Sequence, residues 1–305
     1  YGAPTTLVGN PDSALLANGT CLRFTLTGTD SVGNATSVST VVKVDTAAPS
    51  QTVTRTSVTG GSLLSGTTLW YRGSATGSLT LTSTATDSVS GVASATFGAL
   101  GGTSTGFTFT GSTVTTPAGG PFASNTLSWA AATTSAPTLA VASTDNAGNA
   151  STTTLTLSND STAPSGGALT VNGTAASSGG STSFFAGTLA TGFTIGTRTD
   201  YTDAGSGIAT SALTVEVATL SANTCGTYGS ATTLTGSPAQ TSASTPAIAS
   251  GSCYRYTLTG TDNVGNVSTL VTTVLVDASA PSTPTLAFSS LTGSLGLGAT
   301  DTVYY

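Results

Sequence analysis

The 305-residue chain contains no methionine and no histidine, and only 6% of its residues are charged. Twelve acidic side chains, of which Glu216 is the single glutamate, outweigh six basic ones and give a net charge of −6. With so few basic residues, the chain has no basic patch of the kind that nucleic-acid binding needs. We therefore expect no nucleic-acid partner. No apolar run reaches the roughly 18 residues of a membrane-spanning helix, so no membrane contact by this segment is expected.

Short runs of alternating apolar and polar residues, rich in threonine and valine, predict an all-β protein, because β-branched side chains favour strands. The first such pair of runs flanks Asp30, in the sequence Thr-Asp-Ser-Val-Gly-Asn that ends at Asn34. Asp and Gly at these places predict the turn of a β-hairpin. The pattern returns at Asp145 and Asp262, after steps of 115 and 117 residues.

Two further acidic motifs and an aromatic pair follow the same period. Asp-x-x-Ala-Pro-Ser begins 15 residues after each turn aspartate, at Asp45, Asp160 and Asp277. Asp-x-x-Ser-Gly-(Val/Ile)-Ala begins at Asp87 and Asp203. The aromatic pairs, which we interpret as core or interdomain packing, are Trp70-Tyr71, Phe184-Phe185 and Tyr304-Tyr305. A period near 116 residues is that of a domain, since about 100 residues suffice for a β-sandwich with its own core.

The repeat predicts four parts of the chain, of two alternating types. They are the C-terminal half of a domain (1–50), two complete domains (51–165 and 166–282) and the N-terminal part of a further domain (283–305). Cys21 and Cys253 occupy the same position of the repeat, where the intervening copy has Ala136. We therefore expect Cys-bearing and Cys-free domains to alternate along an extended array.

The periodic set of motifs, three copies of Asp-x-(Val/Ala)-Gly-Asn each followed by Asp-x-x-Ala-Pro-Ser, resembles the tandem bacterial immunoglobulin-like domains of large surface proteins and adhesins. The resemblance covers the whole chain. It implies a seven-stranded β-sandwich for each domain, an extracellular place on a bacterial surface, and a spacer or fibre role. Members of this family often bind calcium between domains, which makes the repeated acidic motifs candidate ligands.

The repeat also predicts one disulfide. Cys225 lies three residues before Tyr228, and the same place relative to the matching Tyr1 lies outside the chain. We therefore predict a Cys225–Cys253 bond, worth roughly 3–4 kcal/mol in the chain-entropy model, and a Cys21 whose partner is outside the chain. Three unrelated reduced thiols are the alternative.

Each repeated aspartate, taken singly, is explained by turn chemistry, because Asp caps the backbone of a type I turn and Gly supplies the left-handed residue that follows. In a seven-stranded sandwich, however, the loops after the second and sixth strands lie at the pole where the preceding linker arrives. This topology predicts two junction clusters. One contains Asp160, Asp203, Asp262 and Asn266, and the other contains Asp45, Asp87, Asp145 and Asn149.

Converging carboxylates repel one another unless a cation joins them. Ca²⁺ accepts six to eight oxygen ligands, and we therefore hypothesise Ca²⁺ at each junction, where it would stiffen the array. The remaining copies of the motifs supply further candidate ligands at Asp30, Asn34 and Asp277. Zinc is disfavoured because the chain has no histidine and its cysteines are assigned to disulfides.

We do not expect an enzyme, because the chain has one glutamate and no histidine. Its aspartate pairs could in principle serve glycoside hydrolysis, but they lie at domain ends and recur in every copy, which suits a joint better than an active site. The leading prediction is a structural repeat segment of an extracellular bacterial fibre, stalk or filament, with neighbouring repeat domains of the same or a longer chain as partners. One alternative is an adhesin module that contacts carbohydrate or a host protein. Another is a subunit that assembles laterally with copies of itself into a sheath, which the low charge would permit.

Overall fold

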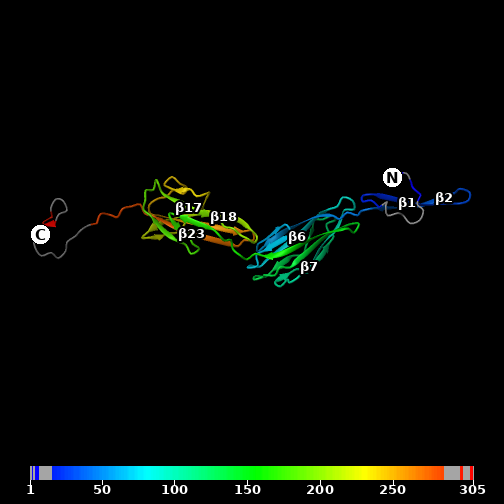
Figure 1. Ribbon diagram of the computed structural model, residues 1–305, viewed down its shortest axis with the longest axis horizontal. Helices are drawn as coiled ribbons and strands as arrows, with labels where there is room; N and C mark the ends of the chain where they lie inside the picture. The colour runs from blue at the N-terminus through cyan, green and yellow to red at the C-terminus, as the bar shows by residue number, and fades with distance from the viewer. Residues whose placement is uncertain (1, 3, 7–15, 285–295, 298–302, 305) are drawn as a thin grey trace.

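The computed structural model describes residues 2, 4–6, 16–284, 296–297 and 303–304. All regular structure in these residues is β-strand, so the described part of the chain has no helix that could cross a membrane. Two β-sandwiches lie end to end, and a separate hairpin precedes them (Figure 1). The protein is therefore an all-β array of tandem sandwich domains with immunoglobulin-like architecture.

The hairpin consists of β1 (Cys21–Thr29) and β2 (Ala35–Lys43), paired antiparallel from Cys21 opposite Lys43 to Thr29 opposite Ala35. These strands form a two-stranded sheet of their own. Their apolar side chains consequently remain accessible, and Leu26 is 75% exposed.

The first sandwich extends from β3 to β13. One sheet contains β3 (Ser50–Thr59), β6 (Gly77–Thr86), β8 (Phe107–Thr108), β10 (Phe122–Ala123) and β11 (Leu127–Trp129). The other contains β4 (Ser62–Ser65), β5 (Thr68–Tyr71), β7 (Val92–Gly101), β9 (Ser112–Val114), β12 (Thr138–Asp145) and β13 (Ala150–Asn159). Leu79, Phe97 and Leu139 are among the fully buried residues of its core, because alternate residues of each strand face the opposite sheet.

The second sandwich extends from β14 to β23. One sheet contains β14 (Ala168–Val171), β15 (Thr174–Ala175), β17 (Phe193–Thr199) and β21 (Ala239–Gln240). The other contains β16 (Thr182–Phe185), β18 (Ile208–Ser221), β19 (Thr224–Cys225), β20 (Thr232–Leu234), β22 (Ser252–Asp262) and β23 (Val267–Val276). Its core includes Val171, Leu213 and Tyr256. A short pair, β24 (Gly296–Leu297) and β25 (Val303–Tyr304), lies beyond it.

The last strand of each sandwich leads the chain out of the domain at one pole. The last strand of the first sandwich, β13, pairs parallel with β5, and β23 pairs parallel with β16 in the second. Strand β13 therefore ends at the pole that faces the second sandwich, and the residue after it, Asp160, enters the linker. The expected count of seven strands per domain is not confirmed, because the strands divide into eleven segments in the first sandwich and ten in the second.

The repeated aromatic pair divides between the two faces of its sheet. Tyr71 is 1% exposed, and its ring lies edge-on to Phe107 and Trp129 at centroid distances of 5.0 and 5.6 Å. Phe184, by contrast, is 61% exposed, so the expectation that it packs in a core or a domain interface is wrong. The reason is strand alternation, which turns adjacent side chains to opposite faces. Tyr305 lies outside the described residues.

A disulfide joins Cys225 of β19 to Cys253 of β22, across a sequence separation of 28 residues. Cys253 is fully buried in a small cluster with Ala218 and Leu275, apart from the main core of the second sandwich. Cys21 is exposed and is bonded to no other described cysteine.

Candidate metal centre

The Asp-x-x-Gly-Asn turn is closed by its own aspartate. In the second sandwich, Oδ1 of Asp262 accepts hydrogen bonds from the backbone N–H groups of Val264 and Asn266, at 3.0 and 2.8 Å. Gly265 has the left-handed φ of 91° that this turn requires. The same pattern holds Asp30 and Asp145 in their copies of the turn, which accounts for the recurrence of Asp and Gly.

The asparagine that ends the turn ties it to the linker. The amide nitrogen of Asn266 donates to Oδ2 of Asp262 at 2.7 Å and to the backbone oxygen of Asp160 at 3.0 Å. Asn149 likewise donates to Asp145 at 2.8 Å and to the backbone oxygen of Asp45 at 3.1 Å. The role of both residues as oxygen ligands of a cation stays a prediction, and in this structure their amide nitrogens donate hydrogen bonds to turn and linker.

The Asp-x-x-Ser-Gly loop holds its carboxylate in the same manner. Oδ1 of Asp87 accepts the backbone N–H groups of Val89, Ser90 and Gly91 at 3.1, 2.8 and 2.8 Å. Oδ2 of Asp203 accepts that of Gly207 at 2.8 Å. These contacts fix the orientation of each carboxylate before any ligand arrives.

The linker aspartate reaches the same loop. Oδ2 of Asp160 accepts the backbone N–H of Ser206 at 2.7 Å, and Oδ2 of Asp45 accepts that of Ser90 at 3.0 Å. Further along the linker, the hydroxyl of Ser268 donates to the backbone oxygen of Pro164 at 2.6 Å. The linker before the second sandwich is thus fastened to it at several points by the protein alone.

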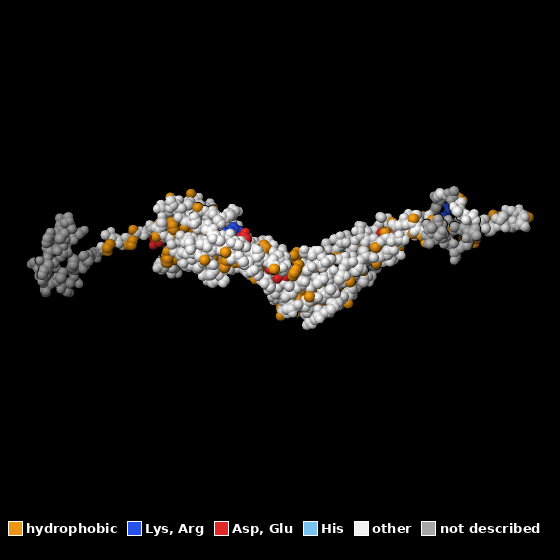
Figure 2. Space-filling model, viewed as in Figure 1, with side chains coloured by type: hydrophobic (Ala, Val, Ile, Leu, Met, Phe, Trp, Pro, Cys, Tyr) orange, Lys and Arg blue, Asp and Glu red, His pale blue; other side chains and the backbone are white. Residues whose placement is uncertain are grey.

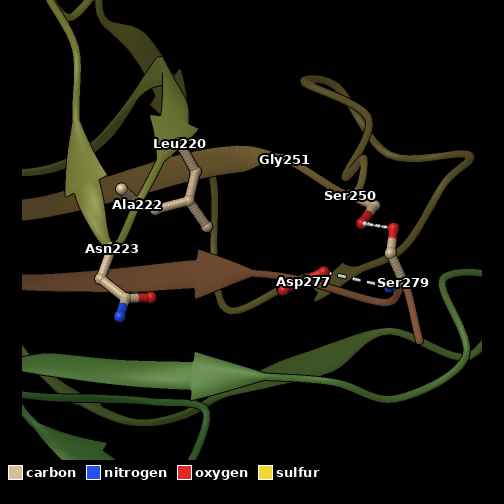
Figure 3. A pocket seen from close by; sticks show the side chains of 7 residues that line it. All are labelled: Leu220, Ala222, Asn223, Ser250, Gly251, Asp277 and Ser279. Carbon is tan, nitrogen blue, oxygen red and sulfur yellow. Dashed lines mark hydrogen bonds between the residues drawn. The ribbon is translucent and has the colours of Figure 1, made fainter. Parts of the chain in front are cut away.

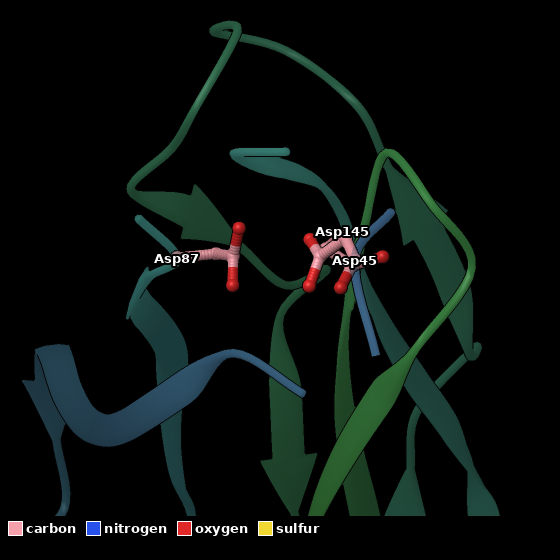
Figure 4. Close-up of side chains that lie close together, drawn as sticks. All are labelled: Asp45, Asp87 and Asp145. Atoms are coloured by element: carbon pink, nitrogen blue, oxygen red, sulfur yellow. The ribbon is translucent and has the colours of Figure 1, made fainter. Parts of the chain in front are cut away.

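Two groups of three carboxylates result. One oxygen from each of Asp45, Asp87 and Asp145 lies within 4.8 Å of the others. Figure 4 shows the three side chains at the pole of the sandwich. The same spacing holds for Asp160, Asp203 and Asp262. Oxygens that bind one Ca²⁺ at about 2.3–2.6 Å lie no more than about 5 Å apart, so the spacing fits this ion.

Among the described residues, neither group forms an ion pair with a basic side chain. The two ion pairs among the described residues join Arg198 to Asp200 at 3.1 Å and Arg255 to Glu216 at 2.8 Å, and neither includes a member of the two groups. The second pair occupies the single glutamate, and Arg255 also stacks on the Tyr228 ring at 3.9 Å.

Hydrogen bonding lowers the pKa of three of the repeated aspartates, Asp30, Asp87 and Asp145. The backbone N–H of Gly91 lowers the pKa of Asp87. Burial alone would raise the pKa of Asp145, but hydrogen bonds from Asn149, Ala147 and Gly148 together lower it. Asn34 lowers the pKa of Asp30 in the same way. Since all three pKa values lie below the ordinary 3.8, these groups carry full negative charge at neutral pH.

Three predicted ligands join neither group. Asp30 and Asn34 lie on the exposed turn of the β1–β2 hairpin and bond to each other at 2.7 Å. Asp277 lies at the far pole of the second sandwich, where its carboxylate accepts the backbone N–H of Ser279 at 3.0 Å. It borders an open hollow of about 380 Å³ (Figure 3). The other residues around the hollow are Leu220, Ala222, Asn223, Ser250, Gly251 and Ser279.

Two residues of the junction between the sandwiches, Arg72 and Val264, were not among the residues predicted from the sequence. Nη1 of Arg72 donates to the backbone oxygen of Gly265 at 2.6 Å, and Val264 is only 1% exposed. A signal was available, because the turn carries valine in the Cys-bearing copies, at Val32 and Val264, but alanine at Ala147.

No protein-family model matches the chain, and the comparison with curated proteins finds no relative. Among solved structures, fibronectin(III)-like modules of Clostridium thermocellum CbhA are similar at 13% identity and a TM-score of 0.33, with 74% of this chain and 94% of that chain covered. A structure from a 1.5-MDa bacterial ice-binding adhesin is similar at 17% identity and a TM-score of 0.30, with 86% and 76% covered.

A tetra-tandem repeat from the extending region of a large adhesion protein is similar at 19% identity and a TM-score of 0.25. That match covers 89% of this chain and 60% of that chain. At such identities and TM-scores, these likenesses carry no inference about what this chain binds or does.

Proposed function

We propose that the chain is a non-catalytic spacer of an extracellular bacterial fibre or stalk, in which Ca²⁺ bound between successive domains limits bending. This role is supported by the origin of the residues in each carboxylate group, which combines the linker with the sandwich that follows it. Asp160 comes from the linker after the first sandwich, whereas Asp203 and Asp262 come from two loops of the second. An ion bound there would cross-link the linker to both loops.

The chemistry of the ligands suits a hard cation. Each group offers carboxylate oxygens only, and Ca²⁺ prefers such ligands, with backbone oxygens and water completing its shell. Asp160 and Asp262 are 3% and 1% exposed, so an ion beside them would be partly shielded from solvent, where its attraction for the carboxylates is stronger. The Cys225–Cys253 disulfide supports an oxidising, extracellular compartment.

The test compares two neighbouring aspartates in the 305-residue chain. Asp203→Asn removes one charge from the group, whereas Asp200→Asn removes a charge that pairs with Arg198 outside it. We expect Ca²⁺ to raise the unfolding midpoint of the wild type and of Asp200→Asn relative to chelator, and to raise that of Asp203→Asn much less. An unchanged wild-type midpoint, with no metal found by elemental analysis, would refute calcium binding.

A second candidate role, lateral assembly, is favoured by the distribution of charge. Between residues 51 and 165 the charged residues are Arg55, Arg72, Asp87, Asp145 and Asp160, and all but Arg55 lie near the two poles. The outer face of β3 and β6 instead carries opposed threonines, such as Thr54 and Thr82, and Figure 2 shows few charged side chains along the sandwiches. Such faces repel one another little. Concentration-dependent sedimentation would reveal the assembly, and a monomer at all concentrations would exclude it.

A further inference from the structure

The turn of the second sandwich inserts a valine into the junction with the first. Val264 is 1% exposed although it does not belong to the core of its own sandwich. The equivalent Val32, in a turn that no described domain precedes, is 82% exposed. The turn itself is the same in both places, and Gly61 of the preceding sandwich lies directly against the backbone of Val264, so that sandwich contributes to the burial.

The first sandwich receives this turn with two residues, Gly61 and Arg72. Gly61 has a φ of 87°, and a Cβ added there would collide with the backbone oxygen of Val264, so only glycine leaves room for the turn. The Nη1 group of Arg72 donates to the next backbone oxygen, that of Gly265, at 2.6 Å. The two sandwiches therefore touch through a close backbone approach and a charge-assisted hydrogen bond, separate from the carboxylate group.

Arg72 is itself held in place by the first sandwich. Its backbone N–H donates to the backbone oxygen of Gly61 at 3.1 Å, and its own backbone oxygen accepts the indole N–H of Trp129 at 3.1 Å. Trp129 is 3% exposed and belongs to the core. These hydrogen bonds hold the backbone of Arg72 in place before the turn binds, so less conformational entropy is lost on binding.

The two partners of this contact belong to different domain types. Arg72 follows the aromatic pair of the Cys-free copy, where the Cys-bearing copy has Ala186 after its own pair. Val264 stands in the turn of a Cys-bearing copy, where the Cys-free copy has Ala147, and Ala147 is exposed. Arginine and valine therefore meet only where a Cys-free domain precedes a Cys-bearing one.

We infer that the pole formed by Gly61 and Arg72 is a recognition surface for the valine-bearing turn, and that it joins the two domain types into rigid pairs. In the reverse order of types, alanine stands at both places, so that junction lacks this contact. The stiff unit of the array is then a Cys-free domain followed by a Cys-bearing one, with more compliant joints between successive pairs. This inference requires neither bound metal nor a particular cellular location.

The test uses the full chain in excess chelator, so that metal binding does not contribute. Residual dipolar couplings measure whether two domains tumble as one body, because rigidly joined domains share one alignment tensor. We expect a shared tensor for the two sandwiches of the wild type. Val264→Ala and Arg72→Ala should each lose it and give two different tensors.

Both substitutions are compatible with folding, since each introduces the residue that the other domain type has at that place. The amide spectrum of each sandwich verifies this directly. Val32→Ala is the matched control for the turn, and it should leave the shared tensor intact. A shared tensor in both variants, or two tensors in the wild type, would overturn the inference.

Discussion

Asn266 offers a quantitative test of how the linker is fastened, because Asn266→Ala removes two donors at once. A hydrogen bond to a charged group is worth about 1.5–3 kcal/mol and one to a neutral carbonyl about 0.5–1.5 kcal/mol. Asn266 is 9% exposed, so water replaces these bonds poorly. We expect the second sandwich to lose about 2–4 kcal/mol of unfolding free energy, or about 8–16 °C in midpoint for a domain of this size.

The asparagines at the two equivalent positions test whether the loss of stability depends on how deeply the side chain is buried. Asn149 makes the same two bonds but is half-buried, so Asn149→Ala should cost the first sandwich less, about 1–2 kcal/mol. Asn34 is exposed, and Asn34→Ala should leave both sandwiches unchanged.

The assay is urea unfolding, followed by tryptophan fluorescence for the first sandwich, which holds both tryptophans, and by hydrogen-exchange mass spectrometry of β22 and β23 for the second. If Asn266→Ala proved as mild as Asn34→Ala, the bonds to the linker could not be stabilising.

Three further outcomes are expected. Reduction of the Cys225–Cys253 disulfide, which closes a loop of 28 residues, should destabilise the second sandwich by about 3–4 kcal/mol. The fluorescence transition of the first sandwich should not move. Equal shifts in both sandwiches would contradict this expectation. Because the pKa of Asp87 is lowered in the folded state, its stabilising effect is present above the ordinary value of 3.8 and is lost as pH falls through the folded value. Acid titration of the midpoint should therefore be shallower for Asp87→Asn than for the wild type. Burial raises the pKa of Tyr71, Tyr201 and Tyr256, and that of Tyr71 to about 12, so Tyr71→Phe should remove one late step from the spectrophotometric titration and leave the other two.

The sequence predicted the class of fold and the convergence of the carboxylates because both follow from periodicity. Strand alternation identifies the all-β class, and a motif that recurs at one domain length must occupy the same place in every copy. Asp160, Asp203 and Asp262 could thus be placed at one pole without coordinates. The hydrogen bonds of Asn266 could not, since only the surrounding geometry shows which acceptors its amide nitrogen meets.

The contact between Arg72 and Gly265 escaped prediction for a different reason. A periodic pattern emphasises what the copies share, whereas this contact depends on residues that differ between them. Arg72 also binds a backbone oxygen, which no side-chain pattern reveals. The signal for it lies in the differences between the copies, such as Val264 against Ala147.

The parallel pairing of each sandwich's last strand determines how the array responds to tension. Strand β13 lies between β5, with Thr156 opposite Thr68 and Asn159 opposite Tyr71, and the antiparallel β12. A pull on the chain draws β13 out along its own axis, while its hydrogen bonds to both neighbours run across that axis. We therefore expect a pull along this axis to load these bonds in parallel rather than one after another. The second sandwich has the same arrangement around β23, so a stretched array would resist at every domain by shear rather than by unzipping.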